Sequence, residues 1–295
     1  HCFSLSGAEE FAADTGATLH ATLEELLAAV EVVDVCTPTP EHPGVVRAAL
    51  DAGKDVICEK PLALTGQEAR ELAEHAERAG RQLFPAHVVR YFPQYAAAKR
   101  AVDTGAVGEL AVLRFERTGS LPDRSWYADE ELSGGIVMDQ MIHDIDQALW
   151  LAGPVASVYA QQSVASADAA VRTAHVVLTH RSGALSHCRG FWGPQGTQFR
   201  YTFELAGDGG LLQYDSAGDP GIVFDEVASA RRGSGDGFLP DVSTLRDPYA
   251  AEIVEFAAAL STGAPTRVDA ADGVAAVEVS RAALESLRTG RSIAC

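Results

Sequence analysis

Short apolar runs alternate with helical segments over the first ninety residues, and this alternation restricts the fold more than any other feature of the sequence. The runs at 31–38, 55–59 and 81–87 have the length and residue types of buried strands. Residues 41–53 and 65–80 between them have the apolar spacing of helices. This strand–helix–strand–helix–strand order predicts a parallel sheet in an α/β unit, with helices packed on its faces.

The second of these helices has recognisable signals at both ends. Thr65 followed three residues later by Glu68 is the pattern of a capping box, and Gly80 is typical of the position just past a helix end. Upstream, residues 7–16 and 22–30 are predicted to form one or two more helices of the same layer.

After residue 90 the sequence changes to longer alternating strands. One strand is predicted at 109–119, and two strand pairs with short turns are predicted at 173–193 and 198–215. This alternation is typical of a mostly antiparallel sheet with one covered face. Further helices are predicted at 91–105, in the apolar stretch that begins at 134, at 247–261 and at 269–289.

The predicted organisation is an α/β domain at 1–88 followed by an α+β domain at 89–295. Clefts between two such domains are common ligand sites. The glycine-rich segment "GSGDG" at 233–237 is predicted to be a loop. It does not connect a strand to a helix, so it is not interpreted as a dinucleotide-binding fingerprint.

Charge and cysteine content exclude several classes of partner. The 41 acidic and 23 basic residues give a formal net charge of −18, and no run of Lys and Arg stands out. Nucleic acid and anionic membranes bind clustered positive charge, so neither is an expected partner. No apolar run approaches the ~20 residues of a membrane helix, and no secretory signal is visible. The five cysteines lack C-x-x-C spacing, so no disulfide framework or zinc site is predicted and a reducing, cytoplasmic setting is expected.

Three ionisable residues lie in the apolar stretch "GGIVMDQMIHDID" at 134–146. Asp139, His143 and Asp146 occur at i, i+4 and i+7, which places them on one side of an α-helix. The spacing alone leaves open a metal site, a structural role near a helix start, and acid/base chemistry by Asp139 and His143. No metal is predicted, because three ligands on one helix is an unfavourable geometry.

Two other motifs directly follow predicted strands, where the carboxyl ends of a parallel sheet face a ligand crevice. Glu59 and Lys60 begin the first motif, "EKP", and a Lys at this position can donate a hydrogen bond to a substrate oxygen. An ordinary solvated Lys at a strand end is equally compatible with the position. The second motif, "CTPTPEH" at 36–42, offers Thr37, Pro38 and His42 to the same crevice.

Taken together, these motifs resemble those of the Gfo/Idh/MocA oxidoreductases. "CTPTPEH", "AGKDVICEKPLA" and "GGIVMDQMIHDIDQALWLAG" occur in the order and spacing of that family, and the resemblance extends from about residue 8 to the chain end. The residues Asp139, Ile142, His143 and Asp146 are most similar to the pattern of inositol and related polyol dehydrogenases.

The resemblance implies a Rossmann domain that binds NAD or NADP, and oxidation or reduction of a sugar, polyol or related carbonyl. It implies that Lys60 orients the reacting hydroxyl, that His143 removes the hydroxyl proton as general base, and that Asp139 orients His143 and binds substrate. It also implies that His87 and Arg90 face the cleft between the domains. The residues expected to bind the cofactor are Cys36, Thr37, Pro38, His42, Glu59, Lys60 and His87.

The sequence departs from the family pattern at its beginning. The family opens with a strand, the glycine motif G-x-G-x-x-G, a helix and a second strand, and none of these is present. The chain begins about 35–40 residues into that pattern, close to the size of one βαβ unit. The expected fold is therefore an N-terminally incomplete Rossmann sheet followed by an α+β domain with a mostly antiparallel open sheet.

Three functions are compatible with the resemblance. The first is an NAD(P)-dependent dehydrogenase acting on a sugar, inositol or related polyol. The second is a non-catalytic sensor of a sugar or nucleotide, and the third is an NAD-dependent glycoside hydrolase of the same fold. Retention of Lys60, Asp139 and His143 favours the first over the sensor, which does not need a base. The resemblance also implies a homodimer or homotetramer built on the β-rich half.

Overall fold

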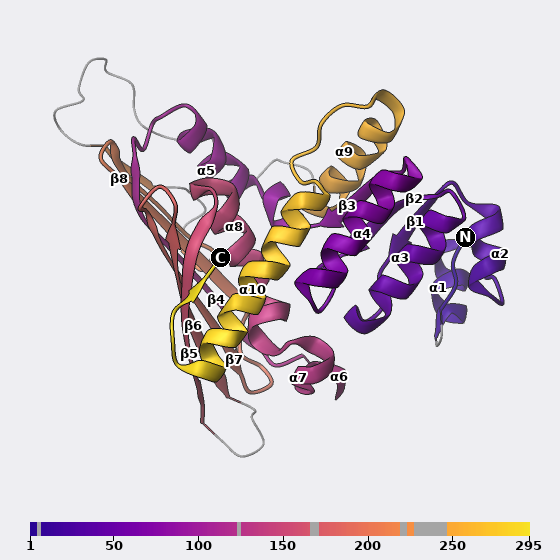
Figure 1. The fold of residues 1–295 in the computed structure, drawn as a ribbon, viewed down its shortest axis with the longest axis horizontal. Helices are drawn as coiled ribbons and strands as arrows, with labels where there is room; N and C mark the ends of the chain where they lie inside the picture. The colour runs from indigo at the N-terminus through magenta and orange to yellow at the C-terminus, as the bar shows by residue number, and fades with distance from the viewer. Residues whose placement is uncertain (5–6, 123–124, 166–170, 219–222, 227–246) are drawn as a thin grey trace.

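The computed structural model describes residues 1–4, 7–122, 125–165, 171–218, 223–226 and 247–295. The loop predicted at 233–237 lies outside these residues. Two sheets lie side by side in the molecule, with helices between them and around the smaller one (Figure 1).

The smaller sheet is the parallel sheet that the sequence predicts. Its strands β1 (Val32–Val35), β2 (Asp55–Glu59) and β3 (Leu83–Ala86) pair in the order β1-β2-β3, and both pairings are parallel. Helices α3 (His42–Asp51) and α4 (Gly66–Ala79) pack on one face, over an apolar cluster that includes strand residues of all three strands. The prediction of an α/β unit is confirmed.

The opposite face of this sheet is covered by a helix from the C-terminal part of the sequence. Helix α9 (Pro248–Thr262) places Phe256 against Phe84 of β3, with the two rings stacked 4.6 Å apart. Helix α1 (Ala8–Thr15) and helix α2 (Leu23–Ala29) lie beyond β1, at the outer edge of the molecule (Figure 1).

Helix α4 begins and ends where its local signals predict. The Thr65 hydroxyl accepts a hydrogen bond from the Glu68 backbone N–H at 3.2 Å, and Gly80 ends the helix in the left-handed conformation with φ 63°. The expected capping box differs in one bond: the Glu68 carboxylate accepts from the Thr65 hydroxyl at 2.8 Å. The cap is therefore closed between two side chains as well as between a side chain and the backbone.

In the described residues the larger sheet has eight strands, in the order β10-β9-β8-β4-β7-β6-β5-β11. Of these strands only β4 and β7 pair in parallel, so the predicted mostly antiparallel sheet is confirmed. The strands are β4 (Leu110–Ser120), β5 (Val155–Val164), β6 (Arg172–His180), β7 (Leu185–Gly193), β8 (Arg200–Gly207), β9 (Gly210–Asp215), β10 (Val223–Glu226) and β11 (Ile293–Ala294).

Helices cover one face of this sheet and leave the other face open (Figure 1). The covering helices are α5 (Pro93–Asp103), α8 (Ile142–Ala152) and α10 (Ala270–Thr289). Alternation along β4 explains the difference between the faces: Leu113 and Phe115 are fully buried under the helices, whereas Arg114 and Glu116 point outward. Within the described residues, no helix combines the length and apolar character needed to span a bilayer.

Helix α10 connects the two halves physically. It packs on α4 and β3 of the smaller unit and on β5 and α8 of the larger one. The close approach to β3 requires glycine at Gly273, since a Cβ there would lie 2.5 Å from Pro85. The chain between β3 and β4 begins with the 3₁₀ turn η2 (Val88–Tyr91), which also packs on α8 and α9.

Candidate functional site

The stretch that carries Asp139 and His143 is not one continuous α-helix, so the expected single stripe of ionisable side chains is wrong in this detail. Two short helices, α6 (Ser125–Ala128) and α7 (Glu130–Ser133), are followed by the π-helical turn η3 (Val137–Met141), and α8 begins at Ile142. A π turn holds one more residue than an α turn, so it rotates Asp139 relative to the residues of α8. Asp139 and Asp146 consequently have different partners.

Gly134 and Gly135 make this irregular segment possible. Both have positive φ, 70° and 65°, and a Cβ on Gly134 would lie 2.4 Å from the side chain of Met138. Gly190 of β7 allows the segment to lie on the large sheet, because a Cβ there would be 2.6 Å from Met141. The glycine pair and Gly190 therefore allow this irregular turn to pack closely on the sheet.

Lys60 and Asp139 meet across 79 residues of sequence. The Lys60 ammonium donates hydrogen bonds to the Asp139 backbone oxygen at 2.8 Å and to its carboxylate Oδ1 at 3.2 Å. Their side chains retain 16% and 15% exposure, so the pair lies just below the surface. The loop after β2 and the turn η3 are thereby joined, and the "EKP" and "DxxxH" motifs are brought into one site.

Burial alone would lower the pKa of Lys60, but the carboxylates of Asp139 and Glu59 outweigh it and the pKa is raised. Lys60 therefore remains an ammonium donor at neutral pH. Glu59 is half-buried, and burial raises its pKa although Lys60 opposes the shift. Its carboxylate accepts a hydrogen bond from the Lys60 backbone N–H at 3.1 Å, which orders the start of the motif.

His143 lies in the first turn of α8 and is half-buried. Its pKa lies well below the usual histidine value because of burial first, and then because of the positive charges of Lys60 and Arg117. His143 is therefore a neutral imidazole at physiological pH. Its Nδ1 is buried and has no hydrogen-bond partner among the described residues. A neutral imidazole beside a fixed ammonium group is suited to accept a proton.

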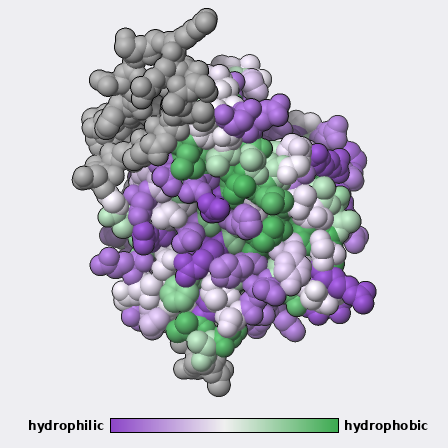
Figure 2. All heavy atoms as spheres, turned by 90° about the vertical axis from the view of Figure 1, so that its left-hand side faces the viewer, coloured by the Kyte–Doolittle hydropathy of each residue, from purple (hydrophilic) through white to green (hydrophobic). Residues whose placement is uncertain are grey.

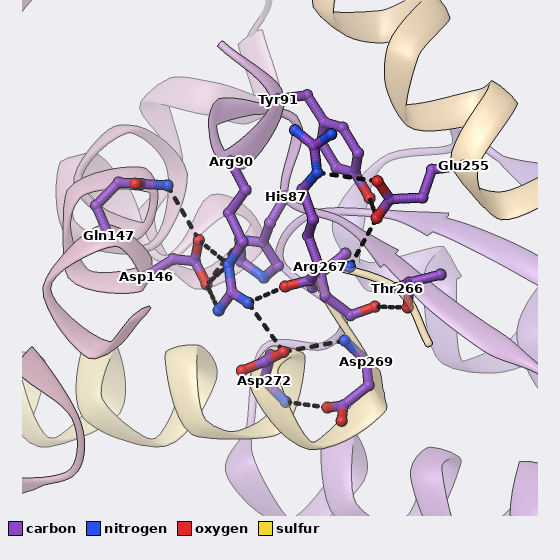
Figure 3. Close-up of polar contacts among 11 residues, drawn as sticks. His87, Arg90, Tyr91, Asp146, Gln147, Glu255, Thr266, Arg267, Asp269 and Asp272 are labelled. Carbon is purple, nitrogen blue, oxygen red and sulfur yellow. Dashed lines mark hydrogen bonds and ion pairs between the residues drawn. The ribbon is translucent and has the colours of Figure 1, made fainter. Parts of the chain in front are cut away.

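Asp146 belongs to a separate buried network, shown in Figure 3. The Arg90 guanidinium donates to Asp146 through Nη2 at 2.7 Å and through Nε at 3.0 Å, and both side chains are 1% exposed. Arg90 also donates to Asp272 at 2.9 Å and to the backbone oxygen of Arg267. This arrangement joins η2, α8 and the start of α10, so Asp146 and Arg90 hold elements together rather than face an open cleft.

The residues expected along the cofactor differ in exposure. Cys36 and Pro38 are exposed, whereas His87 is 1% exposed, so the expectation that His87 faces an open cleft is wrong. Partial desolvation of the Cys36 thiol and the nearby Asp34 raise its pKa to about 12, so this cysteine stays protonated. His42 is 1% exposed. Its ring contacts the backbone oxygens of Pro61 at 2.9 Å and Thr37 at 2.8 Å, which ties the two strand-end motifs together.

Comparisons with known proteins identify the family. Residues 4–87 match the oxidoreductase family model with an NAD-binding Rossmann fold, and residues 95–213 match the GFO/IDH/MocA C-terminal domain model. The chain is 31% identical over 274 residues to myo-inositol 2-dehydrogenase of Thermotoga maritima, an alignment covering 90% of this chain and 79% of that protein. The chain belongs to the Gfo/Idh/MocA family.

Other members agree with this assignment. D-xylose 1-dehydrogenase (NADP(+)) 2 of Haloferax volcanii is 29% identical, with 94% of this chain and 84% of that protein aligned. Among solved structures, GenD2 from gentamicin A biosynthesis, in complex with NAD, superposes with a TM-score of 0.83 at 28% identity. That match covers 97% of this chain and 85% of the GenD2 chain. Members of the family bind NAD or NADP and are dehydrogenases of CH–OH groups.

The sequence motifs of this Gfo/Idh/MocA chain did not predict one buried ion pair near His143. Arg117 of β4 donates to Asp144 of α8 at 2.8 Å, and the two side chains are 4% and 0% exposed. Asp144 directly follows His143, so the pair fixes the first turn of α8 against the sheet. The alternation along β4 could have indicated that Arg117 is buried. Arg117 occupies the same alternating positions as Leu113 and Phe115, which are buried.

A cavity of about 940 Å³ lies apart from the catalytic candidates of the family. It is bordered by the glycine pair that precedes η3, by β5 and β6 and by the last turns of α10, and its lining contains none of Lys60, Asp139 and His143. In the part of the chain that the structure describes, no group of three or more His, Cys, Asp or Glu side chains is arranged to hold a metal ion.

Proposed function

We propose that this chain is an NAD(P)-dependent dehydrogenase that acts on a secondary hydroxyl of a sugar, inositol or related polyol. The observation that carries the proposal is the pairing of a fixed ammonium, Lys60 on Asp139, with the neutral imidazole of His143 in the same site. The named relatives that act on myo-inositol and D-xylose support this class of substrate.

Lys60 and His143 have different roles in this proposal because Lys60 is charged and His143 is neutral. Lys60 has three N–H donors, of which two bind Asp139. The third donates to the substrate oxygen and places it within reach of His143. His143 removes the hydroxyl proton, and Asp139 keeps Lys60 charged and oriented. The nicotinamide, when bound, exchanges the hydride with the substrate carbon.

The strand ends of the smaller sheet supply the cofactor contacts in this proposal. Thr37 follows β1, and its Oγ1 is buried without a hydrogen-bond partner among the described residues, which suits a polar group of a bound nucleotide. Pro38 and Glu59 line the same edge, and His42 holds the two loops in place from beneath. Either NAD or NADP fits this proposal.

The division of labour follows the two matched regions. Residues 1–88 are proposed as the cofactor unit and residues 89–295 as the substrate and self-association unit. The family models matched at 4–87 and 95–213 support a boundary between them, and so does the change from the parallel sheet to the mixed one. Helix α9 is the exception, because it packs on the parallel sheet.

Thermal unfolding with and without NADH or NADPH tests the cofactor part of the proposal. A nucleotide present at a hundredfold its Kd should stabilise the chain by about 2.7 kcal/mol, which is readily seen as a rise in Tm. Oxidation of a panel of polyols and sugars is then followed at the nicotinamide absorbance. No rise in Tm with either nucleotide contradicts cofactor binding by this chain.

The catalytic part is tested with His143→Gln, which keeps a polar side chain but removes the base. Turnover should fall at least about a hundredfold, the usual contribution of a general base, while the nucleotide-dependent rise in Tm is retained. His175→Gln on the exposed side of β6 is the matched control and should keep full turnover. Retained turnover in His143→Gln would show that another group removes the proton.

A further inference from the structure

Buried polar atoms without partners occur in His143, in Gln147 of the same helix and in His87. Among the described residues, His143 Nδ1, both ring nitrogens of His87 and Oε1 of Gln147 are buried and lack a hydrogen-bond partner. Native proteins rarely leave such atoms unpaired, and a buried water is their usual partner where protein groups do not reach. His87 lies 3.8 Å from Asp146, and Asp146 is three residues after His143 on α8, so both histidines lie beside the same turn of this helix.

His87 is held in a fixed place behind the site. It follows β3 directly, precedes η2, and is 1% exposed. Its Nδ1 lies 3.8 Å from Oδ1 of Asp146, and Asp146 is itself clamped by Arg90 (Figure 3). Because Asp146 is an acceptor only, this neighbour favours a proton on Nδ1 of His87. Nε2 of the neutral His87 ring is then an acceptor without a donor.

His143 has the complementary need. A neutral imidazole carries one proton, and a base that faces the substrate with Nε2 must carry that proton on Nδ1. Nδ1 is the buried, unpartnered nitrogen of His143. His143 Nδ1–H is therefore a buried donor without an acceptor, and His87 Nε2 is a buried acceptor without a donor.

We propose that His87 is a positioning residue that fixes the tautomer of His143 through one buried water. His143 Nδ1–H donates to the water, the water donates to His87 Nε2, and His87 Nδ1–H points at Asp146. Arg90 holds the Asp146 carboxylate in place at the end of this series. The series leaves the lone pair of His143 Nε2 free to accept a proton.

The surrounding charges are consistent with two neutral rings. Burial lowers the pKa of both histidines. The positive groups acting on His143 are Lys60, Arg117 and His87, and those acting on His87 are Arg90 and Lys60, with Asp146 and Asp272 opposing them. Because both rings are neutral, no ion pair forms between them. The tautomer of His143 is therefore decided by the direction of the hydrogen bonds.

The inference deepens the proposed function, since it explains how His143 is prepared as the base, but the tautomer is a property of this chain without substrate or cofactor. It is measured by long-range ¹H–¹⁵N correlation spectra of histidine-labelled protein, with signals assigned from His87→Gln and His143→Gln. In the unaltered protein, His143 and His87 should each show a single tautomer protonated on Nδ1. A proton mainly on Nε2 of either ring would overturn the proposal, and this measurement needs no variant to fold.

Two substitutions of His87 separate positioning from packing. His87→Phe fills the space without an acceptor, so His143 should lose its single tautomer and show both forms. His87→Gln restores an acceptor oxygen and should restore the Nδ1–H form. Gln147→Met is the control, because Gln147 lies one turn along α8 from His143 and offers the other unpartnered acceptor. It should leave the tautomer of His143 unchanged.

The proposal is contradicted if Gln147→Met loses the single tautomer of His143, or if a folded His87→Phe keeps it. Either result would mean that His143 has another partner. Where turnover is measurable, kcat of His87→Phe should fall about tenfold or more, because part of the protein then holds the wrong tautomer, while KM changes little and His87→Gln recovers activity. A chain without turnover contradicts the proposed function, but the spectra still decide the tautomer.

Discussion

At the residue scale, Lys60 and His143 show how one site gives neighbouring groups opposite charge states. Burial favours the neutral form of both side chains. Lys60 keeps its charge because Asp139 and Glu59 lie beside it, whereas the charged groups that shift the pKa of His143 are all positive, so His143 stays neutral. A donor and a proton acceptor can therefore coexist at neutral pH without neutralising each other.

Glu252 of α9 carries a pH-dependent cost to stability. It is 3% exposed, its Oε1 has no partner among the described residues, and burial followed by the charges of Glu59 and Asp34 raises its pKa from 4.5 to about 8. Between these two values the folded chain holds a proton that the unfolded chain has released. The free energy of unfolding should therefore decrease as pH rises from 4.5 to 8, by up to about 1.4 kcal/mol per pH unit, and level off above.

Urea denaturation at a series of pH values checks this expectation. Glu252→Gln should remove this part of the slope and make the protein more stable at pH 8, because the amide needs no proton. Glu77→Gln, at an exposed position of α4, is the control and should keep the slope. Equal slopes in the unaltered protein and in Glu252→Gln would contradict the assigned pKa.

At the element scale, local signals and long-range contacts differ in how far the sequence reveals them. Helix α4 could be predicted closely because Thr65 and Gly80 act within a few residues of its ends. The π turn η3 could not, because the same apolar spacing also fits an ordinary α-helix, and contact with Gly190 of β7 decides between them. Likewise, "EKP" and "DxxxH" marked Lys60 and Asp139 as candidates, whereas their direct contact depends on the fold.

Gly134 offers a measurable test of what the π turn requires. Alanine at Gly134 would strain the backbone at φ 70° and also collide with Met138, whereas alanine at Gly263 would strain a similar φ of 71° with no atom within 4 Å. Both substitutions pay about 1–2 kcal/mol for the left-handed conformation. Gly134→Ala should lose a further 1–3 kcal/mol, roughly the cost of overpacking, in chemical denaturation. Equal losses would mean that the Met138 side chain moves aside freely.

At the scale of the whole molecule, one face of the large sheet carries no helix from the described part of the chain. Figure 2 views this face and shows an apolar patch near its middle, surrounded by hydrophilic side chains. Strand alternation places apolar side chains outward from four adjacent strands, and two of these side chains, Tyr159 and Leu185, are 37% and 36% exposed. The outward-facing apolar residues of the central strands are Val112, Tyr159, Val177, Leu185 and Phe191.

We expect this open face to associate with a second copy of the chain. A stable protein interface buries about 800 Å² on each partner, and a flat sheet face with an apolar centre and polar rim has the composition of such a surface. The double substitution Tyr159→Lys and Leu185→Glu puts charges at two outward-facing apolar positions of this face. Sedimentation equilibrium should then show monomers where the unaltered protein shows dimers or tetramers. Phe11→Glu on α1, 56% exposed and remote from the sheet, should leave the assembly intact. If the double variant still assembles, the interface lies elsewhere. If the unaltered protein stays monomeric, the expected interface does not exist.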